Sequence, residues 1–203
     1  MGLPRSWFGP SQAEIWGQLA KEIGAKFEAG DFWKGGKVVA RHNQWTLTLD
    51  TFTVSHGKTS VTYTRMRAPY VNPDGFRFTI YRKGLFTGLG KWLGMQDVVV
   101  GQQPLDDDFV IQGNNESKLR ELFANPHLRE TIQLHPAIHL TVRDDEGWFA
   151  TAFPDGVDEL YFQVGGVSND VDRLKLIYEL FAETLDHLCR IGSAYEIDPQ
   201  VKL

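Results

Sequence analysis

Three arginines and a tyrosine on two predicted strands are the residues whose types and spacing best suit ligand binding. Arg65 and Arg67 share one face of the first strand, and Arg77 and Tyr81 share one face of the next. If a turn at residues 72–75 joins these strands as a hairpin, their spacing of about 4.8 Å brings Arg77 close to the other two arginines. Guanidinium groups gathered in this way need anionic partners, and their forked donors suit carboxylates and phosphates.

Two kinds of partner could neutralise this arginine cluster. The chain carries 26 acidic residues, so internal Asp and Glu side chains are available without the entropic cost of binding a second molecule. We therefore favour internal ion pairs. The alternative is a small anionic ligand bound by Arg65, Arg67, Arg77 and Tyr81.

The segment 84–94 is rich in apolar side chains, although its glycines and broken periodicity predict a loop. It carries Phe86, Leu89, Trp92 and Leu93. Soluble monomers rarely expose a large contiguous apolar patch, so we expect these residues to join the core, cover a pocket or contact a partner. As a partner surface, the loop predicts self-association. Contact with an anionic membrane is disfavoured, because few basic residues lie nearby in a chain of net charge −5.

Other residue patterns that could support chemistry do not match known sites. His135 and His139 have the spacing of metal ligands on a helix, but Pro136 between them and a predicted strand from residue 138 should make their rings diverge. The acidic runs 106–108 and 144–146 lack the alternating spacing of a calcium loop. The sequence therefore predicts no metal and no cofactor, and it favours a non-enzyme while leaving open an active site of dispersed residues.

Composition places the chain among ordinary globular proteins. Its 203 residues are 42% hydrophobic and 23% charged, which argues against disorder. The acidic net charge excludes a general nucleic-acid binder, whose phosphate contacts require a basic surplus. The lone Cys189 permits no internal disulfide, and no signal peptide or long apolar run is evident. We expect a cytoplasmic protein with a single domain over residues 1–203, and a loose division of it into 1–100 and 101–203 is the alternative.

Two amphipathic helices are predicted near the ends of the chain. A capping box at Ser11 and Glu14 starts the first, whose apolar residues recur until Gly30. The second spans residues 170–192, with apolar side chains at helical spacing and Gly192 as a stop signal. Its apolar stripe comprises Leu174, Ile177, Tyr178, Phe181, Leu185 and Leu188. Because this stripe is long and continuous, we expect the helix to lie across a sheet.

Alternating residues and turn signals predict the strands of that sheet. The turns are centred on residues 57, 74, 145 and 155, where glycine accompanies Asp, Asn or Lys. A bulge or bend is expected after Asp50. The expected strands are 38–41, 45–54, 61–66, 76–80, 98–100, 109–111, 138–143, 148–153 and 160–164. With the weakest segments discounted, this pattern predicts an α+β fold with an antiparallel sheet of about seven or eight strands on the long C-terminal helix.

The segment 109–114, followed by Leu119, Leu122 and Phe123, resembles bacterial proteins grouped as a domain of unknown function. The resemblance covers about a third of the chain and rests mainly on residues that build the fold. It implies a bacterial cytoplasmic protein and implies no activity.

These observations favour a non-catalytic binding or assembly module that binds a protein partner or a small anionic ligand. The first alternative is a hydrolase or transferase with a dispersed active site. The second is a peripheral membrane protein that contacts the bilayer through residues 84–94.

Overall fold

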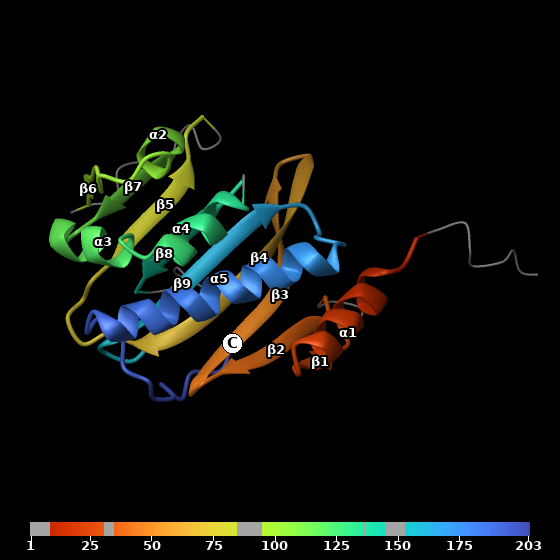
Figure 1. The fold of residues 1–203 in the computed structure, drawn as a ribbon. Coiled ribbons are helices and arrows are strands. Elements are labelled where there is room, and N and C mark those ends of the chain that lie inside the picture. Colours follow the sequence, from red (N-terminus) through yellow and green to blue (C-terminus); the bar gives the residue numbers. More distant parts are fainter. Residues whose placement is uncertain (1–8, 31–34, 85–94, 136, 145–152) are drawn as a thin grey trace, which may run out of the picture.

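The computed structural model describes residues 9–30, 35–84, 95–135, 137–144 and 153–203, and it has one twisted antiparallel sheet with helices on one face (Figure 1). This arrangement confirms the predicted α+β class. The sheet has nine strands, slightly more than predicted. Their order is β1-β2-β3-β4-β9-β8-β5-β7-β6, so strands from both halves of the chain are neighbours.

The strands differ widely in length. The longest, β3 and β4, form a hairpin that extends beyond their other neighbours, whereas the two edge strands β1 and β6 are short. The strands are β1 (Lys26–Glu28), β2 (Lys37–His42), β3 (Trp45–His56), β4 (Thr59–Val71), β5 (Phe78–Arg82), β6 (Gln96–Asp97), β7 (Phe109–Gly113), β8 (His139–Arg143) and β9 (Val157–Gly165).

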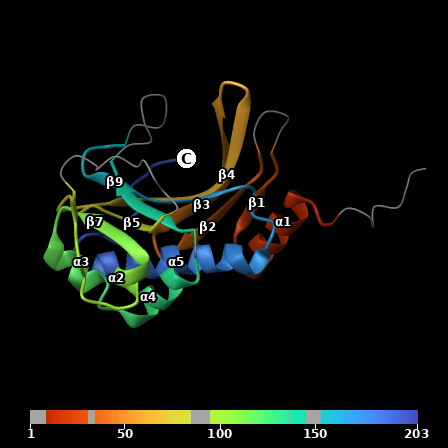
Figure 2. The same cartoon turned by 90° about the horizontal axis from the view of Figure 1, so that it is seen from above.

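The helices of the described chain all lie on the same side of the sheet (Figure 2). They are α1 (Gln12–Glu22), α2 (Leu105–Asp108), α3 (Glu116–Leu122), α4 (Pro126–Gln133) and α5 (Val171–Arg190). The longest, α5, crosses the sheet and contacts α1, α4 and β4. Helices on one face leave the opposite face of the sheet without a helical layer. We call this opposite side the helix-free face.

Helix α5 has the ends that its sequence predicts. The side chain of Asp170 accepts hydrogen bonds from the backbone N–H groups of Asp172 and Arg173, at 3.0 and 3.2 Å. After the helix, Gly192 has a φ of +72°, a left-handed conformation that glycine adopts without strain. The buried side chains of α5 are Leu174, Ile177, Leu180, Phe181, Thr184, Leu185 and Leu188.

The hydrophobic core fills the space between the helices and the sheet. On β3, Leu47 and Leu49 are buried in this core, while the residues between them point to the helix-free face. On β4, Met66 and Ala68 belong to the same core, and β9 adds Leu160 and Phe162 at paired positions. The two-residue period of each strand therefore separates an apolar face from a polar one.

Several predicted boundaries were wrong. The first helix ends at Glu22 and not at residue 30, because Gly24 has a φ of +66° and turns the chain into β1. No bulge follows Asp50, since β3 pairs with β4 without interruption from Thr48 to His56. The expected strand 98–100 is displaced to β6, and 148–152 lies outside the described residues.

Truncating Phe181 tests the packing of α5 on the sheet. Its side chain is fully buried, so Phe181→Ala leaves a cavity and should lower the free energy of unfolding by about 3 to 5 kcal/mol. Glu179→Ala, at an exposed position of the same helix, should change it by less than about 0.5 kcal/mol. Denaturant unfolding measures both. Equal stability of the two variants would contradict the packing described here.

Candidate functional site

The helix-free face of the sheet carries a continuous set of polar and charged side chains, and several of them are buried. Alternation along each strand and register between strands place them on one surface. From β3 across the sheet to β7, this surface includes Thr48, Asp50, Arg65, Arg67, Glu159, Tyr161, Thr141, Arg143, Thr79, Tyr81, His139 and Gln112. Buried polar groups require internal partners, so their contacts decide what the surface can bind.

Arg65 and Arg67 share one carboxylate, that of Asp50 on β3. Nε and Nη2 of Arg65 donate to the two oxygens of Asp50 at 2.6 and 3.1 Å, and Nη2 of Arg67 donates to Oδ2 at 2.6 Å. Arg67 is 4% exposed. Asp50 thus sits between two guanidinium groups. These contacts agree with the favoured expectation of internal partners for both arginines.

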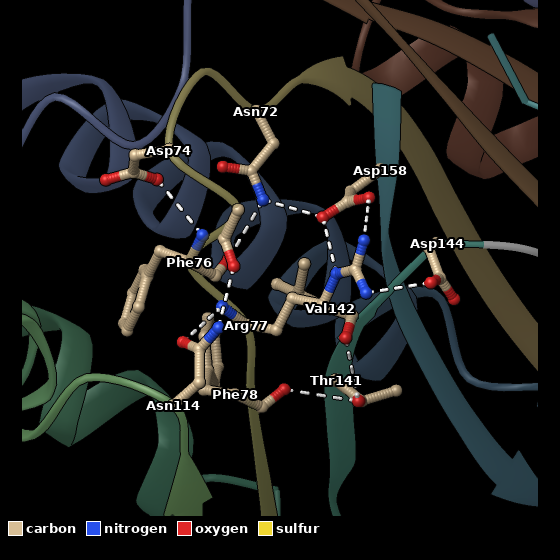
Figure 3. A network of polar contacts seen from close by, with 11 residues as sticks. Asn72, Asp74, Phe76, Arg77, Phe78, Asn114, Thr141, Val142, Asp144 and Asp158 are labelled. Carbon is tan, nitrogen blue, oxygen red and sulfur yellow. Dashed lines mark hydrogen bonds and ion pairs between the residues drawn. The ribbon is translucent and has the colours of Figure 1, made fainter. Parts of the chain in front are cut away.

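Arg77 lies apart from these arginines, which contradicts the predicted hairpin geometry. Arg77 directly precedes β5. In the sheet, strands β9 and β8 lie between β4, which carries Arg65 and Arg67, and β5. Arg77 donates from Nε and Nη2 to Asp158 at 2.9 and 3.0 Å and from Nη1 to Asp144 at 2.8 Å (Figure 3). Asp158, mainly through its hydrogen bonds, raises the pKa of Arg77 above its usual value. The predicted three-arginine cluster is therefore two separate ion-pair groups.

The ion pairs of Arg77 belong to a larger set of polar contacts at one end of β5 and β9. The buried amide of Asn72 donates to Asp158 at 2.6 Å and to the main-chain oxygen of Phe76 at 3.0 Å (Figure 3). Asn114 accepts from the backbone N–H of Arg77 at 3.0 Å. Because a residue that follows β4, one that precedes β5, one in β9 and one that precedes α3 meet here, these contacts hold the β4–β5 connection in place.

Tyr81 also lies away from Arg65 and Arg67. Its ring packs edge-on against His139 of the neighbouring strand β8, with ring centroids 6.4 Å apart. Burial, and secondly the negative charge of Asp97, raise the pKa of its hydroxyl. The four residues predicted to bind one anion thus occupy three places on the sheet.

Sequence reasoning missed the most buried charge on the helix-free face, that of Glu159. Arg143 donates to Glu159 from Nε at 2.9 Å, and the Arg143 guanidinium lies 3.5 Å from the ring centroid of Tyr161. Glu159 is fully buried. The available signal was alternation in β9, where Glu159, Tyr161 and Gln163 interrupt an apolar run. The partner on β8 could not be read from that pattern.

His139 is held neutral by its surroundings. Burial, followed by the positive charge of Arg143, lowers its pKa to about 4. Burial is also the main cause that lowers the pKa of His135, which lies before β8. Over the described ranges, no group of three or more His, Cys, Asp and Glu side chains is arranged to hold a metal ion.

A groove runs along the helix-free face of β1 to β4, and residues 198–203 form one of its sides. Figure 2 shows the C-terminus on the side of the sheet opposite α5. The groove has an outer chamber of about 650 Å³ and an inner chamber of about 330 Å³. The outer chamber is lined by Glu28, Ala29, Gly30, Gly35, Lys37, Asp50, Thr51, Phe52, Thr53, Arg65 and Leu203. The inner chamber is lined by Glu28, Lys37, Val39, Arg41, Thr46, Thr48, Pro69, Asp198, Gln200, Val201, Lys202 and Leu203.

The charges in this groove occur mainly as pairs of opposite sign. Lys37 lies 3.2 Å from Glu28, and Arg41 lies 3.6 Å from Asp198. Arg65 contacts Asp50 as described above. Hydrogen bonds from Lys26 and Lys37 lower the pKa of Glu28. These paired groups remain partly exposed, so the groove offers hydrogen-bond donors and acceptors with little excess charge.

The predicted partner residues Phe86, Leu89, Trp92 and Leu93 lie outside the described residues. Among the helices that the structure describes, none is long and apolar enough to cross a membrane.

Removing Arg77 tests the end group of the sheet. Arg77→Ala leaves the buried carboxylate of Asp158 without its forked donor and should cost roughly 2 to 4 kcal/mol of unfolding free energy. Arg120→Ala is the matched control, because Arg120 also binds a carboxylate, that of Glu116, but on the exposed surface of α3. Its loss should cost less than about 1 kcal/mol. Denaturant unfolding of both variants makes the comparison, and equal losses would contradict a structural role for Arg77.

The neutral His139 predicts acid sensitivity. Its pKa is about 4 in the folded protein and 6.5 ordinarily, so between these values the unfolded chain binds more protons. Its stabilising contribution is present above pH 6.5 and is lost as pH falls to 4, by about 3 kcal/mol in total. The pKa of His135 is lowered as well, so its protonation adds to the loss of stability as pH falls.

Unfolding free energies measured from pH 7 to pH 4 test this expectation. His139→Gln should flatten the profile, whereas His127→Gln, at an exposed position of α4, should leave its shape unchanged. If His139→Gln and the wild type lost stability in parallel, a neutral buried His139 would be wrong.

Comparison with known proteins shows that this chain has a fold similar to that of a solved structure. No family model and no curated protein matches the sequence. Among solved structures, the chain is similar to the crystal structure of the mycobacterial trehalose monomycolate transport factor A, TtfA. The two share 8% sequence identity with a TM-score of 0.54, over 94% of this chain and 98% of the other. At this identity the likeness establishes a common fold over nearly the whole chain.

Proposed function

We propose that the protein is a non-catalytic binding module whose ligand lies in the groove of the helix-free face. The observation that carries this proposal is the groove itself, which has two adjoining chambers that share three lining residues, and charges arranged mainly as mutual pairs. Concave sites with a few placed polar groups are the usual form of ligand sites. In the same groove, the charged side chains that could act as acids or bases are held in ion pairs, which favours binding over catalysis.

The ligand is uncharged and rich in hydroxyl groups. A charged ligand has to compete with an ion pair already formed, such as Arg65 with Asp50 or Lys37 with Glu28. A hydroxyl group can instead donate to the carboxylate and accept from the cation without separating them. The ring of Phe52 lies under the guanidinium of Arg65 and lines the outer chamber, where it adds an apolar contact surface for a sugar ring. This chemistry favours a sugar-bearing ligand over the small anion expected from the arginines alone.

The structural neighbour supports the same class of ligand. Its name describes a factor in the transport of trehalose monomycolate, an ester of the sugar trehalose. A transport factor is also compatible with a protein that binds without catalysing a reaction. A trehalose ester is therefore the natural probe. Self-association through residues 84–94 and a cytoplasmic location stay predictions from the sequence.

Removing the ring of Phe52 from the outer chamber tests the proposal. Wild-type protein should bind trehalose monooctanoate saturably in calorimetry, and Phe52→Ala should weaken that binding about ten-fold or more by removing the apolar contact surface. Tyr63→Ala is the matched control. Tyr63 lies opposite Phe52 in the β3–β4 hairpin, and their rings stack with centroids 5.2 Å apart, so either substitution breaks the same contact. Of the two residues, Phe52 alone lines the groove.

Sodium phosphate at matched ionic strength distinguishes the anionic alternative. It should give no saturable rise in melting temperature. Absence of binding by the monooctanoate to wild type, or equal weakening by the two alanine substitutions, would contradict the proposal. A saturable response to phosphate alone would favour an anion site instead.

A further inference from the structure

The two chambers of the groove meet at one ion pair. Glu28, Lys37 and Leu203 line both chambers. Nζ of Lys37 is 3.2 Å from Oε2 of Glu28 and 3.4 Å from a main-chain oxygen of Leu203. Both side chains of the Lys37–Glu28 pair are 35% exposed, so the pair keeps hydrogen-bonding capacity where the chambers adjoin. A ligand that enters both chambers therefore passes this ion pair.

The inner chamber is lined mainly by charged and polar residues. Thr46 and Thr48 of β3 line it from the sheet, and Gln200 lines it from segment 198–203. The chamber also holds an ion pair of its own, Arg41 with Asp198. A group that fills this chamber thus meets polar residues on both sides, as a group in the outer chamber does.

The ion pair of Arg41 with Asp198 is open enough to take a hydroxyl group. Nη1 of Arg41 is 3.6 Å from Oδ2 of Asp198, which exceeds the ordinary hydrogen-bond length of about 2.7 to 3.2 Å. The two side chains are 54% and 34% exposed. A hydroxyl group that donates to the carboxylate and accepts from the guanidinium bridges them without separating the charges.

The apolar side chains of the inner chamber suit the C–H face of a sugar ring. Val39 and Pro69 line the chamber from the sheet, and Val201 lines it from segment 198–203. A sugar ring carries hydroxyl groups at its rim and C–H groups on its faces, so it contacts both kinds of lining residue. In the outer chamber, Phe52 offers the corresponding apolar surface. The two chambers therefore favour the same kind of group.

The groove is larger than a single sugar ring requires. Its chambers have volumes of about 650 and 330 Å³. Sites of about 300 to 1,000 Å³ bury most of a drug-sized molecule, which is larger than a monosaccharide. One ring in the outer chamber therefore leaves the inner chamber for another.

We infer that the ligand carries at least two sugar rings in succession, one against Phe52 in the outer chamber and the next in the inner chamber, between the sheet and residues 198–203. This inference rests on the proposed function, since it places both rings in the same groove. It adds a second sugar subsite, places the link between the rings at the Lys37–Glu28 pair, and assigns the pair of Arg41 and Asp198 to the hydroxyl groups of the inner ring.

The number of sugar rings is the variable that tests this inference. In calorimetric displacement of trehalose monooctanoate, free trehalose should bind wild type at least about ten-fold more tightly than methyl α-glucoside, because its second ring enters the inner chamber. Trehalose should also bind within about three-fold of the monooctanoate, because the two rings make the contacts and the acyl chain does not.

Two substitutions in the inner chamber should remove the preference for trehalose. Val39→Trp fills the chamber, and Asp198→Ala removes a charged hydrogen-bond acceptor from it. Each should reduce the preference to less than about three-fold while methyl α-glucoside binding is kept. The matched controls lie outside the groove and should retain the full preference. Val99→Trp places the same side chain at an exposed position, and Asp108→Ala breaks a partly exposed pair with Arg82, whose N–O distance is 3.5 Å.

The outcomes separate this inference from the proposed function. If trehalose and methyl α-glucoside bound wild type equally, or if both inner-chamber variants kept the preference, the second sugar subsite would be wrong although the groove binds sugars. Binding of the monooctanoate without binding of free trehalose would also overturn it. If none of the three compounds bound wild type, the proposed function itself would be wrong, and the inference would fall with it.

Discussion

The packing of α5 across the sheet is the constraint on which the rest of the structure depends. This helix buries seven side chains, so every strand beneath it must turn its apolar residues the same way. Because side chains alternate along a strand, the remaining residues are directed to the opposite face. Polar groups such as Thr48, Arg67 and Glu159 therefore lie on the helix-free face. Because they are buried, they require hydrogen-bond or ion-pair partners within the chain. Core packing and surface chemistry are thus two results of one arrangement.

The need of buried charges for partners within the chain explains why the arginines do not form an open anion site. A guanidinium as buried as that of Arg67 is stable only beside a carboxylate or an equivalent acceptor, and Asp50 supplies it from the adjacent strand. Arg77 meets the same requirement through Asp158. The groove differs because two of its ion pairs, Lys37 with Glu28 and Arg41 with Asp198, are partly exposed at both partners, and such pairs keep hydrogen-bonding capacity toward a ligand. Partial exposure, more than charge, separates the candidate ligand site from the structural ion pairs.

Local features of the fold could be predicted from the sequence, whereas the order of the strands could not. The capping box of α1, the ends of α5 and the turn at Gly57 depend on a few neighbouring residues, and each was predicted correctly. The placement of β5 depends on β8 and β9, which come much later in the chain. Arg77 and Asp158 are 81 positions apart, so no local pattern could reveal their contact. The groove was missed for the same reason, because residues 198–203 return to strands near the other end of the chain.

The uneven lengths of the strands bear on how this protein avoids aggregation. The outermost strands of the described sheet, β1 and β6, have three and two residues, so each outer edge exposes few backbone groups to another chain. Lys26, Glu28 and Asp97 add charge there. The long hairpin of β3 and β4 extends past its neighbours instead, and its Thr and Ser pairs bond to one another across the strands. The two short outer strands of the described sheet therefore offer few unpaired backbone groups to a second sheet.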